Sequence, residues 1–275
     1  MRIGKLGRPV SALCGADAHS ISIRGRDLCG DLMGRLTFTD YFFLLVTGRE
    51  PTDDQRFFLD LLLVTIAEHG QTPTAQAARM TYDADPRALQ AAVAAGILGC
   101  GTVVLGTSEL CGELLVEAAA RVKAGEANDT VLRDVVAGRR SRGEKLPGFG
   151  HPLHKPVDPR SERIFALARE RGIEGLHCDL ARRLPAVVEQ AWGKPLVMNV
   201  SMATAAVLLD LDFPAAVIKA IPILGRTAGL LAHLAEEQRN PIGFLMAAHG
   251  EEAIAYDPAA LDPATLDPAA EGGVR

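Results

Sequence analysis

A glycine-rich loop that ends in a histidine carries the clearest chemical signal in this sequence. Residues 146–150 read Leu-Pro-Gly-Phe-Gly, His151 follows at once, and Arg160 stands nine positions later. Glycine has no Cβ, so its backbone amide can approach a ligand closely. Arg160 offers a permanently charged fork that suits a carboxylate or a phosphate. The combination predicts a site for an anionic, oxygen-rich small molecule.

The charge balance limits the kind of partner. The 275 residues include 29 basic and 34 acidic side chains, which gives a net charge of −5. Nucleic-acid binding depends on clustered positive charge, so this composition argues against it. Any anion must therefore be bound by a few focused arginines.

The cysteines and the N-terminus indicate an ordinary intracellular protein. Five cysteines are scattered without a CxxC pair, at positions 14, 29, 100, 111 and 178. This spacing argues against a zinc cluster or a disulfide framework, so we expect no metal and a cytoplasmic location. No long apolar run follows Met1, so neither a signal peptide nor a membrane span is expected.

The elements that must position the loop are predicted to be helices, because alanine and leucine dominate and aromatic residues make up only 5% of the chain. One exception is the stretch 20–25, which is expected to form a short strand or hairpin arm. A glycine-rich join covers 99–106, and a repeated Leu-Asp-Pro theme predicts an extended or disordered tail over 256–275. Helices are predicted over 28–48, 51–70, 86–98, 109–122, 128–138, 160–171, 178–192 and 226–237. The segments 198–209 and 215–223 are strongly apolar and are expected to be buried.

Several short motifs occur along the chain in a recognisable order. They are Ile23–Leu28, Leu36–Phe38, Gly48–Pro51, Ala67–Gly70, Gly148–His151, Asp158–Arg160, Met198–Val200 and Gly225–His233. Together they resemble the citrate synthase family, and most closely its compact members, the citryl-CoA lyases and the lyase module of ATP-citrate lyase. The resemblance implies an all-α, two-domain helical fold and an obligate homodimer. It also implies that a carbon–carbon bond is made or broken between an acyl-CoA and a 2-oxo acid. Coenzyme A is then part of a thioester substrate, and no separate cofactor is expected.

The resemblance also implies a division into domains. Residues 1–112 with 213–255 would form the large domain, and residues 113–212 the small domain that carries the CoA and substrate loop. The two domains are expected to close over the substrate.

Five cationic or imidazole side chains match the family's substrate-binding positions. His151 would hydrogen-bond the oxo or hydroxyl oxygen of the substrate, as a donor in an oxyanion hole does. His69 matches a second donor, although a histidine at a helix end is also a common cap. Arg160 and Arg226 match carboxylate-binding arginines, and Arg239 matches the arginine that the partner subunit supplies.

The same loop is implied to hold the CoA arm. The backbone of Leu146, Pro147, Gly148, Phe149 and Gly150 would face the pantetheine or the adenine. Lys155 and His154 would meet CoA phosphates or stand as solvated charges. The arginines at 139, 140 and 142 would likewise meet CoA phosphates or stand as solvated charges.

The chain departs from the family pattern at the catalytic position. Ser201 stands where family members carry the aspartate that moves the α-proton of the acyl-CoA, and a serine hydroxyl needs another group to take its proton. Residues 108–114 lack a second family histidine, as the lyase branch also does. Glu109, Glu113 and Cys111 are the nearest replacements in the sequence.

These observations lead to one main hypothesis and two alternatives. The main one is a citryl-CoA lyase-like enzyme that forms acetyl-CoA and oxaloacetate, or catalyses the related condensation. The alternatives are a catalytically silent protein that binds CoA esters or polycarboxylates, and a lyase for another β-hydroxyacyl-CoA.

Overall fold

The computed structural model describes residues 10–257, in two compact units. The first unit contains the residues up to His69 together with Gly99–Gly229, and the second contains Gly70–Leu98 together with the residues from Leu230 onward. Of the predicted tail, residues 258–275 lie outside the described residues. The large and small domains predicted from the resemblance have different boundaries from these two units. They describe parts that would close over a substrate. They stay a prediction.

A small antiparallel sheet opens the described chain. β1 (Cys14–Ala16) pairs with β2 (Ile21–Ile23), and β2 pairs with β3 (Arg26–Asp27). Arg24 and Gly25 both have positive φ and make the tight turn between β2 and β3. The predicted hairpin arm at 20–25 is thus confirmed, and the expectation of a helical protein holds outside this sheet.

The helix predicted over 28–48 is divided into two pieces. A five-residue π-helix, η1 (Leu28–Leu32), is followed by a break and then by α1 (Phe38–Thr47). The break has a local cause, because Thr37 and Asp40 form a capping box that starts a new helix. Gly48 ends α1 in the left-handed conformation.

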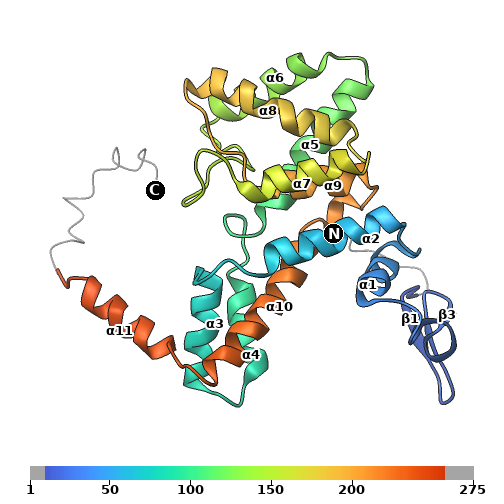
Figure 1. The fold of residues 1–275 in the computed structure, drawn as a ribbon, viewed down its shortest axis with the longest axis vertical. Coiled ribbons are helices and arrows are strands. Elements are labelled where there is room, and N and C mark those ends of the chain that lie inside the picture. Colours follow the sequence, from blue (N-terminus) through green and yellow to red (C-terminus); the bar gives the residue numbers. More distant parts are fainter. Residues whose placement is uncertain (1–9, 258–275) are drawn as a thin grey trace, which may run out of the picture. The chain divides into compact units, whose positions relative to one another are not determined.

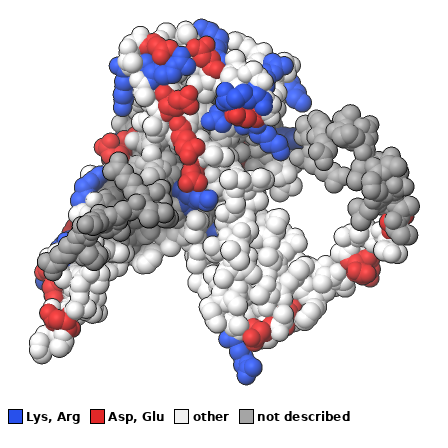
Figure 2. Space-filling model, turned by 180° about the vertical axis from the view of Figure 1, so that it is seen from behind, with Lys and Arg blue, Asp and Glu red and all other residues white. Residues whose placement is uncertain are grey.

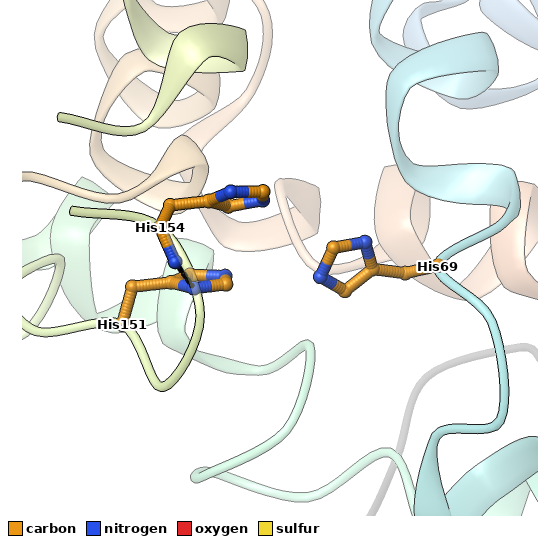
Figure 3. A group of neighbouring side chains, drawn as sticks. All are labelled: His69, His151 and His154. Carbon is orange, nitrogen blue, oxygen red and sulfur yellow. Dashed lines mark hydrogen bonds between the residues drawn. The ribbon is translucent and has the colours of Figure 1, made fainter.

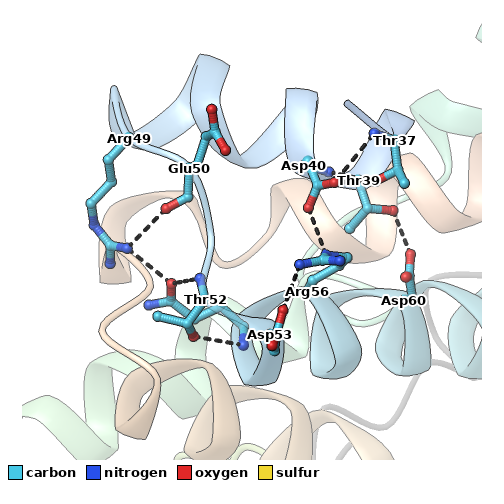
Figure 4. A network of polar contacts seen from close by, with 10 residues as sticks. Thr37, Thr39, Asp40, Arg49, Glu50, Thr52, Asp53, Arg56 and Asp60 are labelled. Atoms are coloured by element: carbon cyan, nitrogen blue, oxygen red, sulfur yellow. Dashed lines mark hydrogen bonds and ion pairs between the residues drawn. The ribbon is translucent and has the colours of Figure 1, made fainter. Parts of the chain in front are cut away.

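Polar contacts fix α1 against α2 (Asp53–Ala67), as Figure 4 shows. Arg56 of α2 donates to Asp40 of α1 at 2.8 Å, and Thr39 donates to Asp60. Thr52 and Gln55 form a second capping box at the start of α2. These contacts set the direction of α2, whose C-terminal end leads to His69.

The main core of the first unit surrounds α9 (Val200–Asp210). Residues 202–209 are buried or nearly so on every side of this helix, which is typical of an apolar helix in a protein interior. Its neighbours, visible together in Figure 1, include α5 (Thr107–Lys123), α7 (Pro159–Glu170) and α8 (Leu176–Trp192), and α6 (Asn128–Ser141) packs on α5 and α8. The helices predicted here are confirmed.

The second unit contains two helices that were not predicted. They are α3 (Pro73–Ala84) and α11 (Gly243–Ala253), which pack on each other, and α3 also packs on α4 (Leu89–Leu98). The buried residues of α3 are Thr74, Ala75, Ala78, Arg79 and Tyr82, so its buried face is made mostly of small and polar residues and its apolar pattern in the sequence is weak.

The apolar segment 215–223 and the helix predicted over 226–237 belong largely to one helix. A short 3₁₀ turn, η2 (Ala215–Val217), precedes a continuous α10 (Ala220–Glu237). Gly225 lies within α10 and does not interrupt it. Its lack of a side chain allows close packing on α2, since a Cβ there would lie 3.0 Å from the Leu63 carbonyl oxygen.

By length and composition alone, the stretch Ala215–Glu237 could cross a membrane. Core helices of soluble proteins pass the same test, and this stretch contains the buried side chains Arg226, Leu230 and Leu234. The feature therefore does not by itself indicate a membrane protein.

Surface charges of both signs are interspersed. On the face drawn in Figure 2, Lys and Arg side chains lie beside Asp and Glu side chains. Arg121 pairs with Glu126 and Asp134, and Arg183 pairs with Asp129 and Asp179. These pairs divide the positive charge of the surface into small, neutralised groups.

A buried ion pair holds the second unit together. Arg79 of α3 is fully buried and donates to Glu237 and Glu236 of α10, and its Nε lies 3.0 Å from Nδ1 of His233. Glu237 also accepts the backbone N–H groups of Ile242 and Gly243, where α11 begins. One carboxylate therefore links three helices.

We expect Arg79→Met to lower the free energy of unfolding by about 3–5 kcal/mol, because Glu237 would remain buried without its cation. Urea denaturation measures the loss. The control is Arg163→Met, since Arg163 and Glu170 are both mostly exposed and such a pair is worth at most about 1 kcal/mol. Equal losses in the two variants would contradict this account of the second unit.

Candidate functional site

The glycine-rich loop is held by the segment that precedes α9. Phe149 and Met198 form an isolated β-bridge, and Gly150 N–H donates to the Val197 carbonyl at 2.7 Å. Asn199 N–H donates to the Gly148 carbonyl at 2.8 Å, and its side chain donates to the Gly150 carbonyl at 3.0 Å. The loop backbone is therefore fixed before any ligand binds.

Gly148 is required both for conformation and for space. Its φ is +80°, and a Cβ would lie 2.8 Å from Cys111 Sγ and 2.8 Å from Met202 Cε. Gly150 also has positive φ, at +92°, but a Cβ there would meet nothing within 4 Å. Of these two glycines, only Gly148 packs closely against α5 and α9.

Asp158 connects the loop to two helices, although the sequence analysis gave it no role of its own. Its buried carboxylate accepts from the backbone N–H of Arg160 at 3.0 Å and from the guanidinium at 3.0 and 2.8 Å. It also accepts from Val200 N–H, at the first residue of α9, at 3.0 Å. Asp158 therefore positions Arg160. The available sequence signal was an aspartate before Pro159, which is typical of a helix N-cap.

The charged state of Asp158 is favoured by these partners. Burial raises the pKa of this carboxyl, but the hydrogen bonds and positive charge of Arg160 and the N–H of Val200 outweigh burial and lower it below its ordinary value. Asp158 therefore remains ionised and keeps Arg160 in place.

Three imidazoles gather in the first unit, as Figure 3 shows. His69 follows α2, and His151 and His154 lie on the loop after Gly150. The rings of His151 and His154 stack with centroids 4.3 Å apart, and the His69 ring lies 5.7 Å from His151 and 5.5 Å from His154. Nε2 of His69 and Nε2 of His154 are buried and have no hydrogen-bond partner among the described residues.

The tautomer of His151 follows from its partners. Nδ1 accepts the backbone N–H groups of Leu153 at 3.1 Å and His154 at 2.9 Å, so the proton of the neutral ring lies on Nε2. Nε2 is 3.1 Å from Nη2 of Arg160, which is also a donor. Two donor nitrogens thus lie 3.1 Å apart, close enough for one acceptor oxygen, such as a carboxylate, carbonyl or alkoxide, to bind both.

Neutral histidines and charged arginines share this site. Burial lowers the pKa of His69, and the positive charges of Arg160, His154 and Arg226 lower it further. Burial and His154 are the main causes of a lowered pKa at His151. Burial also lowers the pKa of Arg226, whose starting value is so high that the side chain remains charged. His69 and His151 are thus neutral donors, and the arginines supply the positive charge.

The three histidines have enough nitrogens for a metal ion, since one ligand atom of each lies within 4.8 Å of the others. The tautomer of His151 opposes that use, because its Nε2 carries a proton and its Nδ1 lone pair is already engaged. The charges of Arg160 and Arg226 oppose a cation further. The residues fit an anion better than a metal.

The structure brings together most of the predicted substrate residues. His69, His151, Arg160 and Arg226 all belong to the first unit and influence one another electrostatically. Arg239 lies in the second unit and is exposed. Ser201 is half-buried in the first turn of α9, Lys155 is exposed, and residues 146–148 are buried. The roles of all these residues stay predictions.

The three suggested replacements for the missing aspartate are poorly suited to proton transfer. Burial strongly raises the pKa of Cys111, so the thiol keeps its proton. Glu113 is exposed, and Glu109 forms an ion pair with Lys219 at 3.5 Å. None of the three has the surroundings of a catalytic base.

A hollow of about 220 Å³ occurs elsewhere in the first unit, in the region of η1 and α1. Its lining is mainly apolar and includes Leu28, Leu32, Leu36, Phe38 and Tyr41. It offers no converging charged groups, so the histidine cluster is the better candidate site.

Comparison with known proteins agrees with the fold. The chain belongs to the citrate synthase family, because the family model for the citrate synthase C-terminal domain matches residues 11–243. A putative citrate synthase 2 of Mycobacterium tuberculosis is 32% identical over 201 residues, covering 69% of this chain and 50% of that protein. A citrate synthase of Synechocystis is 29% identical over 209 residues, covering 74% of this chain and 50% of that protein. The chain spans about half the length of these curated relatives.

Solved structures confirm the predicted citrate synthase-like helical fold. Citryl-CoA lyase from Hydrogenobacter thermophilus is similar with a TM-score of 0.74 and 31% identity, covering 86% of this chain and 87% of that one. ATP citrate lyase from Methanothrix soehngenii, solved with citrate and coenzyme A, gives a TM-score of 0.76 at 20% identity and covers 96% of this chain and 44% of that one. At 20% identity, the similarity to ATP citrate lyase is evidence for the fold only.

The glycine geometry predicts unequal effects of two neighbouring substitutions. Gly150→Ala introduces only backbone strain, of about 1–2 kcal/mol. Gly148→Ala adds overlap with Cys111 and Met202, so it should cost about 1–3 kcal/mol more. Chemical denaturation of both variants checks the difference, and equal stabilities would show that the loop does not rest on α5 and α9 as described.

The lowered pKa values of His69 and His151 predict how stability depends on pH. The unfolded chain takes up protons near the ordinary histidine pKa of about 6.5, whereas the folded chain takes them up only at lower pH. The free energy of unfolding should therefore fall as the pH drops below about 6.5. Urea titrations across this range measure the slope.

The double variant His69→Gln/His151→Gln should show a shallower slope than the native chain. His19→Gln is the matched control, since His19 is exposed, and its slope should equal the native one. If the double variant kept the full slope, the histidine cluster would not be its source.

Proposed function

We propose that this protein is an acyl-CoA carbon–carbon lyase that cleaves citryl-CoA to acetyl-CoA and oxaloacetate, or catalyses the related condensation. The observation that carries the proposal is the 3.1 Å separation between His151 Nε2 and Arg160 Nη2, two donor nitrogens that one substrate oxygen can bind together. The similarity to a citryl-CoA lyase over nearly the whole of both chains supports the choice of substrate.

The charged groups of the site suit a polycarboxylate. Arg160 and Arg226 would bind substrate carboxylates, with Arg160 held by Asp158. His151 and His69 would donate to the oxygen that changes between hydroxyl and carbonyl. A fixed donor at such an oxygen typically contributes about 10²–10³-fold to the rate.

The thioester arm would lie along the loop, in contact with the backbone of residues 146–150 and with Lys155. The fixed geometry of this loop supports the assignment, because a preorganised backbone loses little freedom when a ligand binds. We further propose a cytoplasmic homodimer in which Arg239 reaches the site of the partner subunit.

Ser201 favours a second candidate function, a catalytically silent protein that binds polycarboxylates or CoA esters. Its hydroxyl is no general base by itself, and its backbone N–H contacts Asn199 rather than an acid–base group. This candidate keeps the same binding site but has no turnover. A lyase for another β-hydroxyacyl-CoA is the remaining alternative.

Cleavage of citryl-CoA, followed by mass spectrometry of acetyl-CoA and oxaloacetate, tests the proposal. His151→Ala should lower kcat by at least about 10²-fold, because the donor to the reacting oxygen is lost. His19→Gln should leave the rate unchanged.

Calorimetry with citrate separates the two candidates. Binding without turnover of citryl-CoA or related thioesters would favour the silent protein, and Ser201→Asp would then be expected to restore activity. Turnover that is insensitive to His151→Ala would contradict the proposed site.

A further inference from the structure

We propose that His154 is the residue that carries the proton in the proposed cleavage, taking it from the substrate hydroxyl and delivering it to the thioester α-carbon. This inference rests on the proposed function and adds a catalytic residue to the same site. In the sequence, His154 had only the interpretations of a CoA-phosphate contact or a solvated charge.

The reaction needs a group that both accepts and releases a proton. A hydroxyl proton must leave before the carbon–carbon bond breaks, and the resulting enolate must gain a proton at carbon. General acid–base groups contribute about 10²–10⁴-fold to such steps, so the candidates within the site can be compared.

His151 is unsuited to this task because of its fixed tautomer. Its Nε2 already carries a proton, and its only lone pair, on Nδ1, is occupied by the N–H groups of Leu153 and His154. His151 therefore donates to the substrate oxygen but has no free lone pair there to accept a proton.

Asp158 and the arginines are also unsuited. The Asp158 carboxylate accepts three hydrogen bonds from Arg160 and one from Val200, and these contacts hold it in its ionised form. Arg160 and Arg226 carry guanidinium groups, which do not lose a proton in proteins.

His154 has the geometry that the task requires. Its Nε2 is buried and has no hydrogen-bond partner among the described residues, so its lone pair or its proton is available to a ligand. Its ring stacks on that of His151 at a centroid distance of 4.3 Å and an interplanar angle of 28°, so the two imidazoles lie face to face. A substrate oxygen bound by His151 thus lies next to His154.

His69 shares the buried, unpartnered Nε2 but lies farther from His151, with ring centroids 5.7 Å apart against 4.3 Å for His154. The positive charges of Arg160 and Arg226 lower its pKa in addition to burial, so His69 resists taking a proton. It remains a neutral donor. Of the three imidazoles, His154 is left as the carrier.

The proposed step is balanced without any further reactant. Nε2 of His154 takes the hydroxyl proton, and the bond between the hydroxyl-bearing carbon and the α-carbon breaks. The oxygen becomes the carbonyl of the oxo acid, and the electron pair of the broken bond forms the enolate. The same proton then passes from His154 to the α-carbon, and the imidazole ends neutral.

His154→Gln tests this role, since glutamine keeps a polar group of similar length but does not carry a proton. We expect kcat for citryl-CoA cleavage to fall by about 10²–10⁴-fold while KM and the affinity for citrate stay within about threefold. His19→Gln is the matched control, and circular dichroism confirms folding of each variant.

Two readouts separate proton transfer from a structural role. Added imidazole should restore part of the activity of His154→Ala. The pH profile of kcat should lose one ionisation in His154→Gln. The other ionisable groups around His154 remain in that variant: His69 at the end of α2, His151 and Lys155 on the loop, Asp158 and Arg160 at α7, and Arg226 on α10.

The outcomes distinguish the two proposals. If the native chain cleaves citryl-CoA and His154→Gln does so within about threefold of the native kcat, His154 is not the proton carrier and the proposed function stands. An unchanged pH profile together with no rescue by imidazole would overturn the role of His154 in the same way. If the native chain binds citrate but cleaves no citryl-CoA, the proposed function fails and the role of His154 fails with it.

Discussion

The carboxylate of Asp158 is the contact on which the candidate site depends. It joins the first turn of α7 to the first residue of α9 and holds the Arg160 guanidinium by two of its nitrogens. Without this buried anion, Arg160 would stand unneutralised beside His69 and His151. The arrangement has a general logic, because a buried anion fixes a cation that can still offer donors to a ligand. Here Arg160 Nη2 lies 3.1 Å from His151 Nε2, so both donors are available to one ligand oxygen.

The same cluster shows how one residue type takes different roles through its surroundings. His151 is a fixed donor because two backbone N–H groups occupy its Nδ1. His69 is a neutral donor because nearby arginines lower its pKa. His154 has an unpartnered Nε2, and we propose that it moves protons. Hydrogen bonding and local charge, rather than the imidazole itself, decide these differences.

Secondary structure was predictable where the apolar pattern is strong and less so where small residues do the packing. The apolar run around α9 is confirmed as a buried helix. α3 was missed because its buried face consists mostly of small and polar residues. Gly225 lies inside α10, where its lack of a side chain lets α10 lie close to α2. The division of the predicted helix 28–48 into η1 and α1 was also missed. The apolar pattern continues through this region, although a capping box at Thr37 starts a separate helix.

The sequence by itself determined the family and the helical fold and supplied the candidate residues of the site, because these depend on motif order and on residue types along the chain. Glycine positions, the Asp-Pro-Arg motif and the histidines could all be read there. Only the tertiary structure decided that His154 lies on His151, that Asp158 holds Arg160, and that Cys111 is sealed beneath Gly148. These relations join residues from separate turns and helices, and hydrogen bonding, burial and charge act through distance in space rather than through position in the chain.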